Sequence, residues 1–191
     1  MKIQTTRFGE LEVDKNDIIT FKEGLLGFDH LQKFFIVDPG DQTLILWAQS
    51  IDDGSIAFPI IEPKIFKQDY TVKLLPSELE SLRLESINEA SVYVILTIPQ
   101  DVTEMSANLK APLIINNKAK LARQIVLQDS KLEVRHLMYK DLKRYIVNYT
   151  SDDSQRTMAT EPTVQKMPEA TAEEQTVNQA EKKSSSNQAD A

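Results

Sequence analysis

The stretch Ser-Ala-Asn-Leu-Lys-Ala-Pro-Leu-Ile-Ile-Asn, residues 106–116, decides the fold class. Its polar start, its proline and the dense apolar run that follows are typical of a loop that enters a buried β-strand. Pro112 suits the first position of such a strand, because its missing N–H breaks no ladder hydrogen bond there and its fixed φ stiffens the entry. No residue here is a plausible nucleophile or metal ligand, so the stretch indicates structure rather than chemistry.

Short strand patterns recur on both sides of this stretch. They cover residues 2–7, 10–13, 18–21, 34–37, 43–49, 56–61, 70–75, 91–98, 113–115 and 120–127. The last range also fits a helical spacing, and we interpret it as a strand. In the first pair, Gly9 is expected to supply the positive φ of a hairpin turn.

Helical patterns are few. A capping box formed by Ser77 and Glu80 after Pro76 predicts one short helix, and apolar residues at three- and four-residue steps predict another over 135–149. Many short strands with little helix favour a mainly β fold, because closing a sheet removes its exposed edges. We therefore expect a small antiparallel β-barrel-like domain with one or two short helices.

The composition changes near residue 150. Residues 151–191 contain no Leu, Ile, Phe, Tyr or Trp, so they offer too little apolar surface to offset chain entropy. The sequence thus predicts a folded domain over 1–150 and a disordered polar, acidic tail over 151–191.

Length, charge and cysteine content limit the possible functions. The 191 residues suffice for one ordinary domain, and a formal net charge of −7 argues against direct nucleic-acid binding and favours basic partners. The absence of cysteine fits a reducing compartment. The amino terminus has no apolar signal core and no apolar run reaches membrane-spanning length, so we expect a cytoplasmic protein without a membrane partner.

The sequence does not show a catalytic or metal-binding constellation. His30 and His136 lie far apart in the chain, whereas a metal site needs three or four convergent groups. Asp52 and Asp53 could serve acid–base chemistry, but they fall in a glycine-containing turn where aspartate usually accepts backbone hydrogen bonds. We therefore predict a protein that is not an enzyme and that uses no cofactor or metal.

The segment Gly24-Leu25-Leu26-Gly27 allows three interpretations. It resembles the Gly-x-x-Gly loop of some RNA-binding domains, but Glu23 and Asp29 flank it where basic residues are needed. It can form a tight crossing between strands. It can also present Leu25 and Leu26 as an apolar patch for a partner.

Several motifs together resemble the bacterial flagellar assembly factor FliW family. They are Phe-Lys-Glu-Gly-Leu-Leu-Gly-Phe at 21–28, Gln-Ser at 49–50, the strand around Phe58, Phe-x-x-Asp-Tyr at 66–70, Ala-Asn-Leu-Lys-Ala-Pro-Leu-Ile-Ile-Asn at 107–116 and Gln-Ile-Val-Leu at 124–127. Their order and spacing match over about residues 1–129. One departure is Leu26, which stands where the family often has proline.

The resemblance implies a cytoplasmic chaperone and translation regulator that is monomeric when free. In the family, one partner is flagellin and the other is CsrA, an RNA-binding repressor of flagellin translation; the factor released by flagellin binds and antagonises CsrA. The expected contact residues are Leu25, Leu26, Asp52, Asp53, Asn108, Leu109 and Lys110. The alternatives are an RNA-binding small β-barrel and, less favoured, a hydrolase or sugar-binding barrel.

Overall fold

The computed structural model describes residues 1–40 and 44–144. Its strands are β1 (Lys2–Thr5), β2 (Gly9–Glu12), β3 (Ile19–Phe21), β4 (Lys33–Val37), β5 (Leu46–Ser50), β6 (Ala57–Ile61), β7 (Ser91–Thr97), β8 (Ser106–Ala107), β9 (Leu113–Asn116), β10 (Leu121–Gln124) and β11 (His136–Leu137). The helix α1 spans Pro76–Leu82, and the short 3-10 helices are η1 (Lys15–Asp17), η2 (Pro63–Ile65), η3 (Ile87–Glu89) and η4 (Val102–Glu104). The predicted tail, 151–191, lies outside the described residues.

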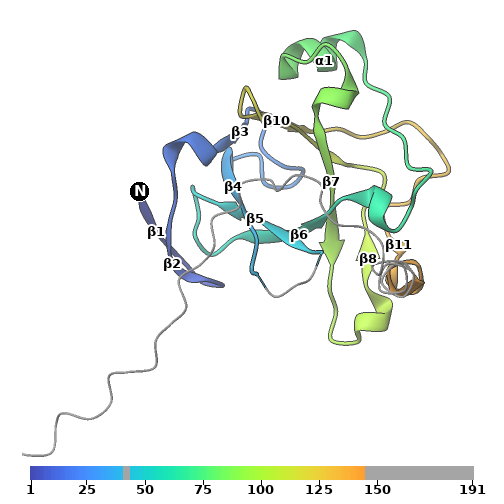
Figure 1. Ribbon diagram of the computed structural model, residues 1–191, viewed down its shortest axis with the longest axis horizontal. Helices are drawn as coiled ribbons and strands as arrows, with labels where there is room; N and C mark the ends of the chain where they lie inside the picture. Colours follow the sequence, from blue (N-terminus) through green and yellow to red (C-terminus); the bar gives the residue numbers. More distant parts are fainter. Residues whose placement is uncertain (41–43, 145–191) are drawn as a thin grey trace, which may run out of the picture.

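A closed barrel forms the centre of the molecule (Figure 1). Its seven strands follow the order β3, β4, β5, β6, β7, β9 and β10, and β10 returns to pair with β3. The strands predicted over 34–37, 43–49 and 56–61 are confirmed as β4, β5 and β6, which pair as an antiparallel meander. The expectation of a purely antiparallel barrel is wrong at one seam, because β10 and β3 pair in parallel through Leu121↔Thr20 and Ala122↔Phe21. A ring with an odd number of strands cannot alternate direction throughout, so closure requires a parallel pair.

Apolar side chains fill the inside of this barrel. The buried cluster consists of Ile19, Phe21, Leu25, Leu31, Phe34, Ala48, Ile60, Leu113, Ile115 and Ala122. Phe21 and Phe34 meet edge to face with ring centroids 5.3 Å apart. Each fully buried side chain of this size stabilises the fold by about 1.5–3 kcal/mol relative to exposure. The run at 113–115 is therefore a central barrel strand, as its sequence predicts, with Pro112 directly before it.

A second buried cluster lies on the outer wall of the barrel. Ile61, Val94 and Ile114 alternate with inward-facing neighbours and pack under the connection between β6 and β7, which carries α1. Residues 70–75 are not a strand, which corrects the prediction. Their alternating pattern arises because Val72 and Leu74 pack onto this cluster without a strand partner.

The start of α1 also differs from the prediction. The N-cap is Leu75, and its backbone N–H donates to Glu78 Oε2 over 2.7 Å, so Glu78 rather than Glu80 closes the first turn. Pro76 occupies the first helical position, where its missing N–H costs nothing.

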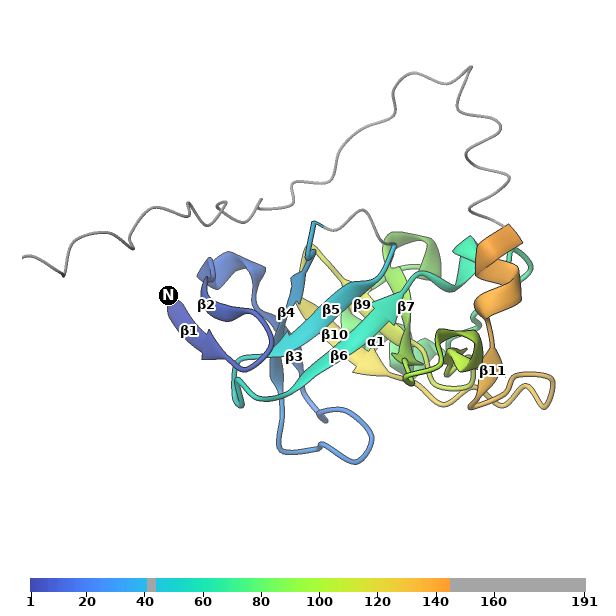
Figure 2. The same ribbon diagram turned by 90° about the horizontal axis from the view of Figure 1, so that it is seen from below.

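The amino-terminal hairpin covers the outer face of β4 and β5 (Figure 2). Gly9 has φ +69°, as the hairpin prediction requires. Trp47 is buried in the cluster under the hairpin, and the Arg7 guanidinium lies 3.5 Å from its ring centroid. Gly54 touches the hairpin so closely that a side chain there would collide with the carbonyl oxygen of Gln4.

The carboxyl-terminal part of the described chain begins differently from the predicted helix over 135–149. His136 and Leu137 form β11 and pair with β8, and the helix starts at residue 139 and is described to residue 144. Met138 is fully buried whereas Leu137 is 59% exposed, so these residues do not share one helical face. No helix within the described ranges is long and apolar enough to span a bilayer.

Candidate partner-binding surface

One end of the barrel collects several of the connections singled out from the sequence. The chain leaves β3 at this end and returns into β4 through residues 22–32, and the β5–β6 turn lies at the same end because Phe34 pairs with Ser50. Strand directions place the ends of β7 and β10 and the start of β9 there too. We call this the loop end of the barrel; Figure 2 shows the 22–32 loop projecting from it.

The turn at residues 24–28 is tight and closes on itself. Gly24 has φ +68°, and a Cβ there would lie 2.5 Å from the Asp29 Cα, so only glycine fits without displacement. Leu25 and Phe28 exchange backbone hydrogen bonds of 3.3 and 2.7 Å. As a result Leu25 points into the barrel core, whereas Leu26 at the tip is 60% exposed. The tight-crossing interpretation is confirmed, and of the two leucines only Leu26 can touch a partner directly.

Residues 108–112 form a braced segment rather than a free loop. The buried hydroxyl of Tyr70 donates to the Leu109 carbonyl over 2.7 Å, and burial raises the Tyr70 pKa above the usual 10.0. The Leu109 N–H donates to the Glu133 carbonyl over 3.0 Å. Asn108 Oδ1 accepts from the Ala111 N–H over 3.1 Å and so shapes the turn. The Leu109 side chain is 1% exposed, so it supports the segment from below.

The ladder between β9 and β10 continues past both strands at this end. The Ile125 N–H donates to the Pro112 carbonyl over 3.0 Å, and the Leu127 N–H donates to the Lys110 carbonyl over 2.8 Å. Lys110 is half-buried, and its Nζ lies 3.4 Å from the Asp129 carbonyl oxygen. The segment is thus held on both sides, which gives Asn108 and Lys110 fixed positions at the surface.

Gln124 joins the two segments. Its Oε1 accepts from the Leu26 N–H over 2.9 Å, and its Nε2 donates to the Ala111 carbonyl over 3.1 Å. The Gln-Ile-Val-Leu run at 124–127 is one of the motifs that resemble the FliW family, but the resemblance gives Gln124 no individual role. No local pattern signals its bridging role, because its two partners lie 98 and 13 positions away in the chain.

Asp52 and Asp53 occupy the β5–β6 turn at the loop end. Asp52 Oδ2 accepts from the Gln32 and Lys33 N–H groups over 2.7 and 2.8 Å, which ties this turn to the end of the 22–32 loop. Asp53 Oδ1 accepts from the Ser55 hydroxyl and N–H over 2.6 and 2.8 Å, and these bonds lower the Asp53 pKa. Both residues are exposed, and one carboxylate oxygen of each shapes the turn through these hydrogen bonds.

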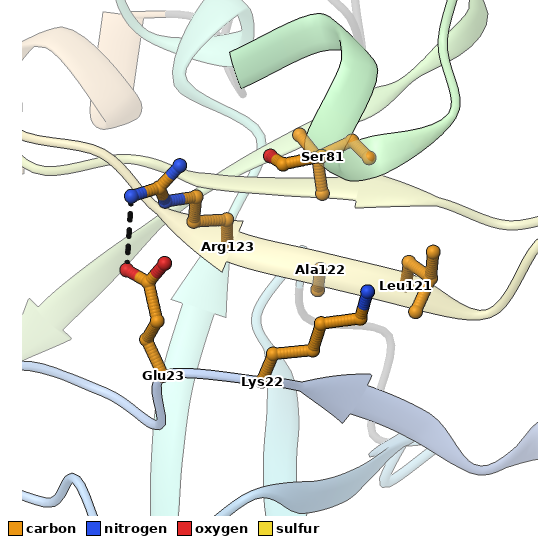
Figure 3. Close-up of a pocket in the computed structure, with 7 residues that line it drawn as sticks. Lys22, Glu23, Ser81, Leu121, Ala122 and Arg123 are labelled. Atoms are coloured by element: carbon orange, nitrogen blue, oxygen red, sulfur yellow. Dashed lines mark hydrogen bonds and ion pairs between the residues drawn. The ribbon is translucent and has the colours of Figure 1, made fainter. Parts of the chain in front are cut away.

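A shallow groove lies beside the parallel seam, between α1 and β10 (Figure 3). Arg123 and Glu23 form an ion pair of 2.9 Å across its rim, and Lys22 points into it from the chain after β3. Leu121 and Ala122 supply an apolar wall. Among the residues that line the groove, Arg123 is paired with Glu23, and the Ser81 hydroxyl donates to the Glu78 carbonyl over 2.8 Å.

The two histidines lie in different surroundings. His30 is exposed, with Nδ1 3.8 Å from Asp29 Oδ1, whereas the His136 ring stacks on Phe66 with centroids 6.1 Å apart. In the described part of the chain no group of three or more His, Cys, Asp or Glu residues could hold a metal ion.

The structure therefore places all seven predicted contact residues at the loop end. Five are at least partly accessible: Leu26, Asp52 and Asp53 are exposed on turns, and Asn108 and Lys110 are half-buried at fixed positions. Leu25 and Leu109 are core residues, so they can act only through their neighbours. The residues that sequence reasoning missed are Tyr70 as the anchor of the 108–112 segment and Gln124 as the bridge.

Comparison with known proteins identifies the family. The model of the FliW protein family matches residues 2–138, which is more than half of the chain. The chain belongs to the FliW family. Curated relatives named flagellar assembly factor FliW include one from Bdellovibrio bacteriovorus, 42% identical over 147 residues and covering 77% of this chain and 84% of the relative. Another, from Thermoanaerobacter pseudethanolicus, is 38% identical over 149 residues and covers 78% and 99%.

A solved FliW structure supports the same assignment. The crystal structure of the flagellar assembly factor FliW superposes with a TM-score of 0.69 at 29% identity, covering 73% of this chain and 97% of that one. The sequence resemblance to FliW is thus confirmed, and the chain is a member of a family of flagellar assembly factors.

Proposed function

We propose that this protein is a cytoplasmic partner-switching factor that binds flagellin as a chaperone and, when free, binds and antagonises the translational repressor CsrA. The observation that carries the proposal is membership of the FliW family over residues 2–138, whose curated relatives are named as flagellar assembly factors. Antagonism of CsrA would relieve repression of the flagellin messenger RNA.

The properties of the chain support such a role. A protein with a formal charge of −7 is attracted to a basic RNA-binding partner and repels RNA from it. If flagellin and CsrA compete for the factor, the amount of free CsrA depends on flagellin that has not been exported. This switch operates by mass action and requires no catalysis.

The loop end is the proposed contact surface for flagellin. Leu26 presents an apolar side chain on a turn that Gly24 and the Leu25–Phe28 hydrogen bonds hold rigid, so binding costs little ordering entropy. An amphipathic helix that places one apolar residue against Leu26 would fit this geometry.

The test is a competition assay with the full chain. Flagellin is titrated into the preformed complex with CsrA, and both bound species are quantified. Release of CsrA by flagellin is the expected result, and binding to neither partner would end the proposal.

A matched pair of variants then tests the surface. Leu26→Asp should weaken flagellin binding at least about tenfold, because it places a charge in an apolar contact. The control is Leu75→Asp, since Leu75 is 63% exposed in a different segment, at the N-cap of α1. Equal loss in both variants would show that Leu26 has no special role.

A further inference from the structure

Gln124 connects two segments that are far apart in the chain. Its Oε1 accepts from the Leu26 N–H, 98 positions away, and its Nε2 donates to the Ala111 carbonyl, 13 positions away. Both groups of one amide are therefore used, each at an ordinary hydrogen-bond distance.

The two segments are otherwise anchored separately. The 24–28 turn is fixed by its own hydrogen bonds and by Leu25 in the barrel core, and the 108–112 segment by Tyr70 and by residues 125–133. Across residues 1–40 and 44–144, no hydrogen bond runs directly between these segments. The polar link between them passes through the Gln124 side chain.

Exposed apolar side chains lie on both sides of this link. Leu26 is 60% exposed next to the amide that Gln124 binds, and Val126, two residues beyond Gln124, is 46% exposed. Ile125 and Leu127 are buried, so the strand alternation puts Gln124 and Val126 on the same face. The Gln124 amide thus ties the turn that carries Leu26 to the 110–112 backbone, on the face where Val126 is exposed.

We propose that Gln124 is a positioning residue that holds the Leu26 turn and the 108–112 segment as one partner-binding unit. This inference rests on the proposed function, because it assigns Gln124 a role in binding flagellin at the loop end. Gln124 acts through Leu26: with the amide in place the turn presents Leu26 in one position, and without it the turn retains its own hydrogen bonds but loses its fixed relation to Ala111.

Three variants separate this role from general stability. Gln124→Met keeps the length and removes both hydrogen bonds, and Gln124→Glu keeps the acceptor for Leu26 but sets an oxygen against the Ala111 carbonyl. Gln128→Met is the control, because Gln128 is an exposed glutamine on the same face four residues later. NMR measures the two hydrogen bonds of Gln124 separately, through amide hydrogen exchange at Leu26 and the carbonyl ¹³C shift of Ala111.

We expect Gln124→Met to speed exchange at Leu26 about tenfold, to shift the Ala111 carbonyl signal and to weaken flagellin binding about tenfold. Gln124→Glu should move the Ala111 signal while it leaves Leu26 protected, and Gln128→Met should leave all three readouts unchanged. The melting temperatures of Gln124→Met and Gln128→Met should agree within a few degrees.

A double-mutant cycle with Leu26→Ala decides whether Gln124 acts through Leu26. If it does, adding Gln124→Met to Leu26→Ala should weaken flagellin binding less than about twofold further. Additive losses, or unchanged binding in Gln124→Met, would overturn the proposal. The two NMR readouts test the Gln124 bridge without flagellin. If the wild-type chain binds no flagellin, the proposed function fails. If exchange at Leu26 and the Ala111 signal are both unchanged in Gln124→Met, the bridge itself is refuted.

Discussion

The buried hydrogen bond from Tyr70 to the Leu109 carbonyl gives a prediction with a definite size. Tyr70 is 2% exposed, and its hydroxyl lies 2.7 Å from the oxygen. Tyr70→Phe removes the hydroxyl donor and leaves the buried Leu109 carbonyl without this hydrogen bond. The free energy of unfolding should therefore fall by about 1.5 kcal/mol at pH 8. Urea denaturation at 25 °C measures this, with Tyr139→Phe as the control because Tyr139 is only half-buried.

The same residue predicts a dependence on pH. Burial raises the Tyr70 pKa in the folded protein above the usual 10.0, so the stability linked to its neutral form is complete below pH 10 and is lost as pH rises further. At pH 11 the unfolded chain ionises this tyrosine, which lowers the stability of the wild type by about 1.4 kcal/mol relative to Tyr70→Phe.

The hydrogen bond of Tyr70 and the ionisation of Tyr70 in the unfolded chain have opposite effects on the stability of the wild type relative to Tyr70→Phe. The wild type should be more stable by about 1.5 kcal/mol at pH 8, and the difference should be close to zero at pH 11. Other tyrosines titrate in both proteins, so their effects cancel. A difference that stays constant from pH 8 to pH 11 would refute the buried, hydrogen-bonded state of Tyr70.

Two further predictions concern the loop end. Gly24→Ala should lower the free energy of unfolding by about 3 kcal/mol, because it adds a clash with the Asp29 backbone to the strain of a positive φ. Gly27→Ala should lower it by only about 1 kcal/mol in the same urea assay, because a Cβ at residue 27 meets nothing within 4 Å. Similar losses for both would contradict the packing described here. Asp52→Asn retains an acceptor for the amides of the 22–32 loop and should lower the free energy of unfolding by about 1 kcal/mol. Because it removes the negative charge, it should also weaken CsrA binding, as Asp52→Lys does; calorimetry measures both. A binding loss confined to Asp52→Lys would assign Asp52 to the turn alone.

Local features of the fold could be predicted because they depend on neighbouring residues. Positive φ at Gly9 follows from a hairpin turn between two short strands, and a buried strand after Pro112 follows from its apolar run. The error over residues 70–75 has a physical cause. Alternation shows that one face is buried, but it does not show whether the backbone has a strand partner.

Long-range features could not be predicted from the same patterns. Leu25 and Leu26 are equally apolar neighbours, and only the fold decides that the first fills the barrel and the second faces solvent. The role of Gln124 depends on residues 13 and 98 positions away, which no local pattern contains. The family resemblance singled out residues 21–28 and 107–116 together, which the structure places at one end of the barrel, because it compared whole segments rather than single positions.

The parallel seam explains why these distant contacts gather on β10. Only two residue pairs are in register between β10 and β3, so a short hydrogen-bond ladder closes the barrel. The Arg123–Glu23 ion pair that spans the seam is substantially exposed and contributes at most about 1 kcal/mol, decreasing with salt. Packing of Ala122 in the barrel and the ladder hydrogen bond from the Thr20 N–H to the Lys120 carbonyl therefore carry more of the closure at physiological salt. Since Ala122 closes the barrel and Gln124, two residues later, binds Leu26, closure of the fold and presentation of the proposed contact surface depend on the same strand.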